Sequence, residues 1–291
     1  MAFTALQEIL DVCKKDQIPF WKAIFQDDLH ERDADEADSK GKMAALWKAM
    51  REAAERYDAG EKSHSGLVGG QGGIMEAYMN EKETLCGDFV SQVIVGALQM
   101  GESNACMKRI VAAPTAGACG VLPAVLVPYC RRFEPDEERI LEALYVAAGI
   151  GQVIAARAYI AGASGGCQAE IGAASAMAAG ALVHLQGGSD EAIVHASVMA
   201  IKNLLGLVCD PVAGLVEVPC VKRNVVGAMN ALSSADMALA GITSRIPPDQ
   251  VIDAMKEVGD LMNSSLKETG EGGLAGTPYG KEMAEKIIGH K

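Results

Sequence analysis

An alanine-rich tract from Ile171 to Leu185 limits how this chain can fold. The tract is too short and too weakly hydrophobic to span a bilayer, and the charges of Arg157 and Glu170 interrupt its extension towards the N-terminus. We therefore expect a buried helix, whose small side chains let the backbones of neighbouring helices approach closely. Only 4% of the residues are aromatic, so tight helix-on-helix packing is the expected core.

Apolar side chains recur at helical spacing along most of the chain, and no convincing alternation of period two is present. The fold class predicted from this pattern is all-α. Asp136, Ser189 and Asp249 are expected at helix starts, where short polar side chains cap free backbone N–H groups. The expected helices cover residues 3–15, 42–58, 88–101, 121–130, 136–161, 170–186, 189–206, 223–240 and 249–262.

The charge balance excludes one class of partner. With 38 acidic and 26 basic residues the net charge is −12, and no run of lysine and arginine exceeds two residues. No surface is therefore expected to neutralise phosphates, so nucleic acid is not an expected partner. The N-terminus has no basic region followed by an apolar block, and we expect a cytoplasmic protein that does not bind membranes. The dense run of charges from Asp27 to Glu36 is expected to be a solvated face or a connector, and no function is assigned to it.

Eight cysteines in a chain without a secretion signal indicate reduced thiols. The sequence contains no Cys-x-x-Cys pair, so a zinc ribbon or a thioredoxin-like site is not expected. Cys167, Cys209 and Cys220 lie in glycine-rich or proline-rich contexts, where a turning backbone can direct several sulfurs at one bound group. We interpret that group as an iron–sulfur cluster. Three cysteines leave one iron without a protein ligand, and such an iron can act on a substrate as a Lewis acid, so the chain is interpreted as an enzyme.

Spacing alone does not select this set of cysteines. The same number of residues separates Cys119 from Cys130 as separates Cys209 from Cys220, and Cys119 also lies in a glycine-rich segment. Two rival ligand sets therefore remain open from the residues alone. Apart from ligand sets, the expected role of four thiols is that of small buried hydrophobic residues, namely Cys13, Cys86, Cys106 and Cys130, whereas Cys119 is left open.

A glycine-rich stretch from Ser63 to Gly73 is predicted to be a long loop, because its five glycines disfavour a helix. The backbone amides of such a loop, with the hydroxyls of Ser63 and Ser65 and the imidazole of His64, suit the binding of a carboxylate. A flexible connector is an equally good interpretation. A second glycine-rich segment, from Thr269 to Gly280, is expected either to fold back over a site or to fray.

Three motifs stand in a fixed order along the chain: Pro114–Gly120, Gly166–Gly172 and Cys209–Cys220. Together they closely resemble the iron–sulfur-dependent L-serine dehydratases, in their α subunit or α domain, over a match that runs from about residue 60 to Ala275. The resemblance implies an all-helical catalytic domain that holds a [4Fe-4S] cluster through Cys167, Cys209 and Cys220, with one iron lacking a cysteine ligand. It thereby favours this set over Cys119 and Cys130.

The resemblance also implies a reaction and a partner. The reaction is the elimination of water from L-serine, which gives pyruvate and ammonia. Single-chain relatives carry a further cysteine near the C-terminus that can occupy the fourth iron, but residues 276–291 contain none. This difference fits the two-subunit type, so a separate β subunit is implied. One compact α domain is expected overall. Residues 1–60 should form its N-terminal helical segment, and residues 61–291 should form its cluster-binding catalytic region.

Candidate substrate contacts come from two loops. The serine carboxylate would be held by hydroxyl and amide groups, which belong to Ser63, Ser65, Gly69, Gly70, Thr115, Ala116 and Gly117. His64 is the candidate base for the Cα proton, with Ser65 beside it as a catalytic candidate; a base from the β subunit is an alternative. Lys222 and Arg223 either offset the negative charge of the cluster, bind the substrate carboxylate or are ordinary surface charges at a helix start.

Other activities are compatible with the same features. Cysteine desulfhydration and threonine deamination follow the same elimination chemistry, and one extra methyl group is a modest discriminator. A pyridoxal-phosphate enzyme needs a Schiff-base lysine and a phosphate-binding glycine loop, which Ser164–Gly166 could imitate. A non-catalytic iron–sulfur scaffold or electron-transfer subunit is a third alternative, although incomplete cysteine ligation argues against electron transfer.

Overall fold

Helices form nearly all of the regular structure. The computed structural model describes residues 2–289, without the side chain of residue 288. Within this range no strand is present and the one β-bridge joins Cys209 to Lys267, which confirms the all-α prediction. The helices are α1 (Leu6–Asp16), α2 (Phe20–Arg32), α3 (Glu36–Glu55), α4 (Gln71–Glu81), α5 (Gly87–Ala105), α6 (Val121–Phe133), α7 (Glu137–Arg157), α8 (Gly162–Gly165), α9 (Cys167–Leu185), α10 (Asp190–Asn203), η1 (Val212–Gly214), α11 (Cys220–Leu239), α12 (Pro248–Leu261), η2 (Ser264–Leu266) and α13 (Pro278–Gly289).

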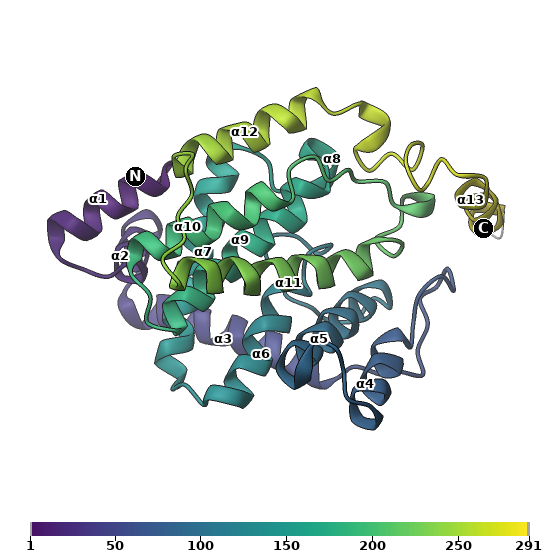
Figure 1. Cartoon of the computed structure of the whole chain (residues 1–291), viewed down its shortest axis with the longest axis horizontal. Helices are drawn as coiled ribbons and strands as arrows, with labels where there is room; N and C mark the ends of the chain where they lie inside the picture. The colour runs from purple at the N-terminus through teal and green to yellow at the C-terminus, as the bar shows by residue number, and fades with distance from the viewer. Residues whose placement is uncertain (1, 290–291) are drawn as a thin grey trace.

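Helix α9 lies at the centre of the fold. Every residue from Ile171 to Leu185 is buried, and α9 packs against α6, α7, α10 and α11 (Figure 1). Its alanines and glycines allow these close approaches, because a small side chain keeps two helix axes near each other. The predicted buried helix is therefore confirmed. It begins at Cys167, three residues before the expected start.

The N-terminal helices cover one side of this core. Helix α2 packs on α7 through buried side chains such as Phe20 and Phe25, and α3 contacts α5, α6 and α7. The charged run from Asp27 to Glu36 has no buried residue, as expected for a solvated face, but most of it is helical and it is not a connector. It forms the second half of α2, a short turn and the first residue of α3, because Asp35 caps α3 by accepting from the Asp38 amide at 2.8 Å.

Two of the three predicted helix starts are N-caps. The side chains of Asp136 and Ser189 accept hydrogen bonds from backbone N–H groups in the first turns of α7 and α10. Asp249 instead lies one residue inside α12, and its carboxylate accepts from the amides of Leu6 and Gln7 at 2.8 and 3.2 Å. Asp249 therefore caps α1 and joins the N-terminal helix to α12.

Helix α7 is the one described helix that is long and apolar enough to cross a membrane by length and composition. Of its apolar window, 61% is buried inside the protein, where α7 packs against α9 and α2. It is accounted for as a core helix.

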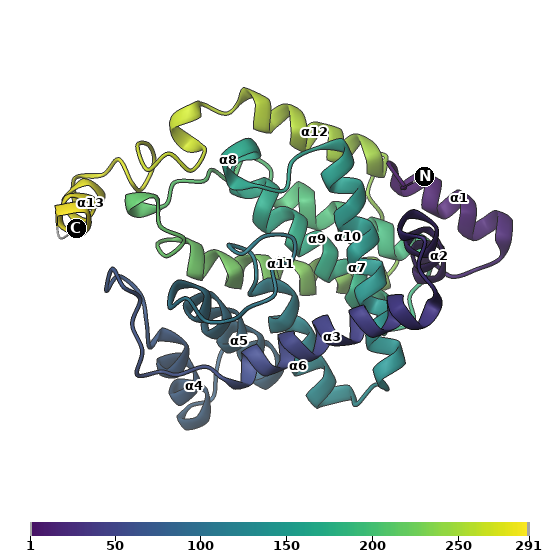
Figure 2. The ribbon, with the colours of Figure 1, turned by 180° about the vertical axis from the view of Figure 1, so that it is seen from behind.

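Three glycine-rich connections converge at one end of the molecule, at the right in Figure 1 and at the left in Figure 2. They are the loop before α4, the segment between α10 and α11, and the tail after α12. The predicted loop is confirmed for residues 63–70, but Gln71 begins α4, so the prediction was wrong for residues 71–73.

Candidate functional site

Three cysteines from distant segments meet at this end. Cys167 is the first residue of α9, Cys220 is the first residue of α11, and Cys209 lies between α10 and η1. All three are buried, with 2%, 7% and 3% of their surface exposed. They lie close enough that the charges of Cys167 and Cys220 raise the pKa of Cys209. The fold therefore brings together the set that the sequence motifs favoured.

The electrostatics of these thiols favour the neutral form. Burial raises the pKa of Cys167 and of Cys220 to about 12, and it also raises the pKa of Cys209. None of the eight cysteines forms a disulfide. Thiolates at this position therefore require a compensating cationic group, which is the condition under which metals bind cysteine sulfur.

The rival pair of cysteines does not converge. Cys119 is fully buried and its Sγ donates to the Met100 carbonyl oxygen at 3.7 Å. Cys130 lies near the end of α6, whereas Cys119 precedes that helix, so the helical rise alone separates the two by about 13 Å. Among the other thiols, Cys13 is buried as predicted, but Cys86 is exposed.

An ion pair holds two of the cysteine segments together. Arg223, in the first turn of α11, donates from Nη2 to Asp210 Oδ1 at 2.7 Å and from Nη1 to the Val208 carbonyl oxygen at 2.7 Å. Its charge also lowers the pKa of Cys167. Arg223 is therefore not an ordinary surface charge, whereas Lys222 is exposed. Sequence reasoning missed Asp210, whose partners are fixed by the fold.

A buried amide ties the loop before α6 to α11. Asn224 Oδ1 accepts from the Gly120 amide at 2.9 Å, and Asn224 Nδ2 donates to the carbonyl oxygens of Gly117 and Cys220 at 2.8 and 3.0 Å. Asn224 is 1% exposed. These three bonds fix the 114–120 motif against the residue that begins α11.

The loop before α4 reaches the same region through its serines. Ser63 Oγ and Ser65 Oγ both donate to Glu217 Oε2, at 2.7 and 2.5 Å. Glu217 is buried and lies three residues before Cys220. His64 is exposed between the two serines. The loop that carries the candidate substrate contacts is therefore docked beside the cysteines, and Glu217 is a further residue that sequence reasoning missed.

The glycines of this loop are oriented by Glu102, a carboxylate of α5 that is 1% exposed. Glu102 accepts from the amides of Gly69, Gln71 and Gly72 at 2.9 to 3.1 Å, and from the Tyr57 hydroxyl at 2.6 Å. This carboxylate explains why α4 forms despite two glycines in its first turn, since it supplies acceptors for free N–H groups. The Gly69 amide is thereby engaged within the chain.

The second predicted loop lies against α9. Thr115 Oγ1 donates to Glu170, one helical turn after Cys167, and the Ala116 carbonyl oxygen accepts from the Cys119 amide. Burial raises the pKa of Glu170, and the nearby Glu268 raises it further. Glu170 lies inside the 166–172 motif. Its place in that motif was the one feature of the sequence that could have marked it as a candidate site residue.

The C-terminal glycine-rich segment folds back on the site and does not fray in the described range. The Cys209 amide donates to the Leu266 carbonyl oxygen at 2.8 Å, and the Glu268 amide donates to the Cys209 carbonyl oxygen at 2.7 Å. Asp210 Oδ2 accepts from the Leu274 amide at 2.8 Å. The tail thus places Glu268 beside Cys209.

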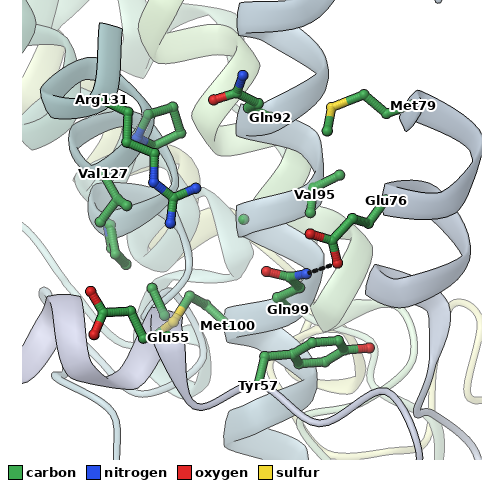
Figure 3. Close-up of a pocket in the computed structure, with 14 residues that line it drawn as sticks. Glu55, Tyr57, Glu76, Met79, Gln92, Val95, Gln99, Met100, Val127 and Arg131 are labelled. Carbon is green, nitrogen blue, oxygen red and sulfur yellow. Dashed lines mark hydrogen bonds between the residues drawn. The ribbon is translucent and has the colours of Figure 1, made fainter.

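A separate pocket of about 390 Å³ lies between α3, α4, α5 and α6 (Figure 3). In Figure 3 the Gln99 side chain donates to Glu76 across the pocket, at 3.1 Å, and Arg131 faces it from α6. Its lining contains none of the three converging cysteines. Tyr57, which lines the pocket and donates to Glu102, links the pocket to the loop before α4.

No group of three or more histidine, cysteine, aspartate or glutamate side chains within residues 2–289 is arranged to hold a single metal ion. The three cysteines are nevertheless near enough to interact electrostatically.

Known proteins share sequence with the chain over nearly its full length. The family model described as serine dehydratase alpha chain matches residues 12–275. The probable L-serine dehydratase alpha chain of Bacillus subtilis (strain 168) is 44% identical over 287 residues, which cover 99% of this chain and 96% of that protein. The L-serine dehydratase alpha chain of Peptoniphilus asaccharolyticus is 41% identical over 283 residues, which cover 97% of each chain.

A third relative is longer than this chain. L-serine dehydratase TdcG of Escherichia coli (strain K12) is 36% identical over 283 residues, which cover 94% of this chain and 61% of that protein. This chain therefore matches part of one relative and nearly the whole of two alpha chains. The matched residues include all three converging cysteines, and the chain belongs to the serine dehydratase alpha chain family.

Proposed function

We propose that this protein is the α subunit of an L-serine dehydratase, a lyase that eliminates water from L-serine and releases pyruvate and ammonia. The observation that carries the proposal is the convergence of Cys167, Cys209 and Cys220, buried and free of disulfides, at the end where three loops meet. The relatives whose names include L-serine dehydratase support the choice of substrate.

The donor set fits a [4Fe-4S] cluster bound through Cys167, Cys209 and Cys220. Each of the three thiols can bind one iron of such a cluster. Because the thiols are buried, they lose their protons only when a positively charged group binds beside them. A bound cluster with one iron free of cysteine supplies a Lewis acid that stabilises negative charge on the leaving oxygen. The surrounding residues bind and orient the substrate and exclude water.

Each docked loop has a role in this proposal. The loop that holds Ser63 and Ser65 closes one side of the site through Glu217, and the loop that holds Thr115 closes another through Glu170. Backbone amides of these loops hold the substrate carboxylate, because the hydroxyls of Ser63 and Ser65 already donate to Glu217 and the Thr115 hydroxyl donates to Glu170. The Gly69 amide is likewise taken by Glu102. His64 is exposed on the first loop and is the proposed base for the Cα proton.

A separate β subunit is part of the proposal. Two relatives that the match covers almost completely are named alpha chains, whereas the longer relative has about two fifths of its length outside the match. A partner chain that supplies the missing part accounts for both observations. The eight free cysteines support a cytoplasmic location, where thiols stay reduced.

The test is anaerobic reconstitution of the α subunit with iron and sulfide, with and without the β subunit, followed by a pyruvate assay on L-serine. We expect a broad absorption in the visible range that bleaches in air, and pyruvate formation with both subunits present. L-Threonine and L-cysteine are the comparison substrates, and slower turnover of both is expected.

Matched cysteine variants identify the ligands. Each of the variants Cys167→Ser, Cys209→Ser and Cys220→Ser is expected to abolish the visible absorption. The controls Cys119→Ser and Cys130→Ser are expected to keep it. A discrete absorption band of an internal aldimine would instead indicate a pyridoxal-phosphate enzyme. A loaded complex that makes no pyruvate from any of the three amino acids would reject the proposed activity and favour a scaffold.

A further inference from the structure

Glu170 faces the three cysteines without a cationic partner. It lies one helical turn after Cys167, and its negative charge raises the pKa of Cys167, Cys209 and Cys220. Within residues 2–289 its side chain forms no ion pair, and its one hydrogen bond comes from the Thr115 hydroxyl. The carboxylate is therefore held in place, mostly buried, and electrically uncompensated.

The loop before α6 confines this carboxylate on one side. A Cβ atom placed on Gly117 would lie 2.7 Å from each carboxylate oxygen of Glu170, so the backbone approaches as closely as only glycine permits. Asn224 holds Gly117 in that position through its carbonyl oxygen. The Glu170 carboxylate is therefore packed against this loop and has no room to swing further towards it.

Glu268 adds a second uncompensated carboxylate. A Cβ atom on Gly162 would lie 2.6 Å from Cys209 Sγ and 3.3 Å from Glu268 Oε2, so the thiol and this carboxylate meet at the same point of α8. The charge of Glu268 raises the pKa of Glu170. No ion pair of Glu268 is present among the described residues, and Arg223, the cation near Cys167, is engaged by Asp210.

The neighbouring sulfurs indicate independently that a ligand belongs here. Cys209 and Cys220 are more than nine-tenths buried, and neither sulfur has a hydrogen-bond partner within residues 2–289. The proposed cluster accounts for the thiols, but not for the two carboxylates beside them. The carboxylates favour a further positively charged ligand, because an unpaired buried charge is costly. L-Serine carries such a charge on its ammonium group.

We propose that Glu170 binds the ammonium group of the amino-acid substrate, with Glu268 as a second carboxylate that strengthens the attraction. This inference rests on the proposed function. Binding the ammonium at Glu170, and the carboxylate and hydroxyl elsewhere in the site, makes three points of attachment. Three points distinguish the L from the D enantiomer and direct the Cα–H bond to one side.

The test compares two ligands that differ only by the amino group. L-Serine is the proposed substrate, and 3-hydroxypropanoate, which lacks the ammonium, is tested as a competing ligand of the reconstituted complex of α and β subunits. The variant is Glu170→Gln, which keeps the size of the side chain and an acceptor for Thr115. We expect KM for L-serine to rise at least about tenfold, as for loss of a charge-assisted hydrogen bond, and the inhibition constant of 3-hydroxypropanoate to change by less than about threefold.

The second readout does not depend on turnover. Iron content and visible absorption of Glu170→Gln should match those of the wild type, and titration of the absorption change should show the same selective loss of L-serine affinity. Glu271→Gln, an exposed carboxylate in the same tail as Glu268, is the matched control and should bind both ligands as the wild type does. An equal loss for both ligands, or no loss for L-serine, would overturn the inference.

A second variant keeps the inference testable if Glu170→Gln does not take up iron. Glu268→Gln should then show a smaller loss confined to L-serine, and an equal effect on both ligands would reject ammonium recognition by these carboxylates. A wild-type complex that makes no pyruvate would reject the proposed function itself, before any variant is compared. The two failures are therefore distinguishable.

Discussion

Arg223 Nη2 donates to Asp210 Oδ1 at 2.7 Å, and this ion pair joins the segment that carries Cys209 to the helix that begins at Cys220. The other oxygen of Asp210 accepts from the Leu274 amide, which belongs to the tail. The side chains are 13% and 4% exposed, so the pair is shielded from water. One buried carboxylate therefore positions three parts of the chain around the cysteines.

Asp210→Asn is expected to lower the free energy of unfolding by about 3 to 5 kcal/mol, because it leaves the half-buried guanidinium of Arg223 without its counterion. Urea denaturation measures the change, and iron content per chain after reconstitution should fall with it. The control is Asp253→Asn, which breaks an exposed pair with Arg157 and should cost at most about 1 kcal/mol. Equal losses in the two variants would contradict a special role for the buried pair.

Gly273→Ala is expected to detach the tail from Asp210. Gly273 has a φ of 57°, and an added Cβ would lie 2.4 Å from Asp210 Oδ2. The left-handed backbone alone costs about 1 to 2 kcal/mol for alanine, and the contact adds to that. Hydrogen exchange at the Leu274 amide should accelerate. Gly41→Ala, in the exposed helix α3 with open space around it, should leave that exchange unchanged.

Replacing both Ser63 and Ser65 by alanine is expected to release the loop before α4. The Glu217 oxygen that accepts both hydroxyls is buried and would lose two donors, at a cost of about 1 to 3 kcal/mol. Limited proteolysis should then cut within residues 63–70 faster than in the wild type. Ser233→Ala, on an exposed part of α11, is the control, and the same cleavage rate in both variants would show that Glu217 does not hold the loop.

His184 is expected to make stability depend on pH. Burial and the nearby Arg139 lower the pKa of His184 below its usual 6.5. Glu142, whose Oε2 lies 2.9 Å from His184 Nε2, acts in the opposite direction and raises this pKa, but its effect is smaller. Below about pH 6.5 the unfolded chain binds a proton that the folded chain does not, so stability falls as the pH falls. Urea denaturation at pH 7.5 and 5.5 should show a smaller difference for His184→Gln than for the wild type. The exposed His30→Gln variant should keep the wild-type difference, and an unchanged difference in His184→Gln would exclude this residue as the cause.

The helical fold class, the buried helix of residues 171–185 and the caps at Asp136 and Ser189 were predictable from the sequence. Each depends on a local pattern: the spacing of apolar residues, a run of small side chains, or a polar residue at a helix start. The loop of residues 63–70 was predictable for the same reason, because glycine disfavours helix wherever the rest of the chain lies.

Contacts between distant residues were not predictable in this way. Asp249 caps α1 and Glu102 caps α4, so two helix starts depend on carboxylates from other helices. The residues around Cys209 and Cys119 likewise did not show which of the two is a site residue, because both cysteines lie among turn-forming residues.

The sequence by itself determined which segments become helices and which become glycine-rich loops, because those preferences act over a few neighbouring residues. Only the tertiary structure decided that the starts of α9 and α11 lie at the same end, that Ser63 reaches Glu217, and that Glu170 faces the thiols without a cation. The physical reason is that these contacts arise from how helices pack around α9, and packing joins residues that are far apart in the sequence, such as Ser63 and Glu217, which are 154 positions apart.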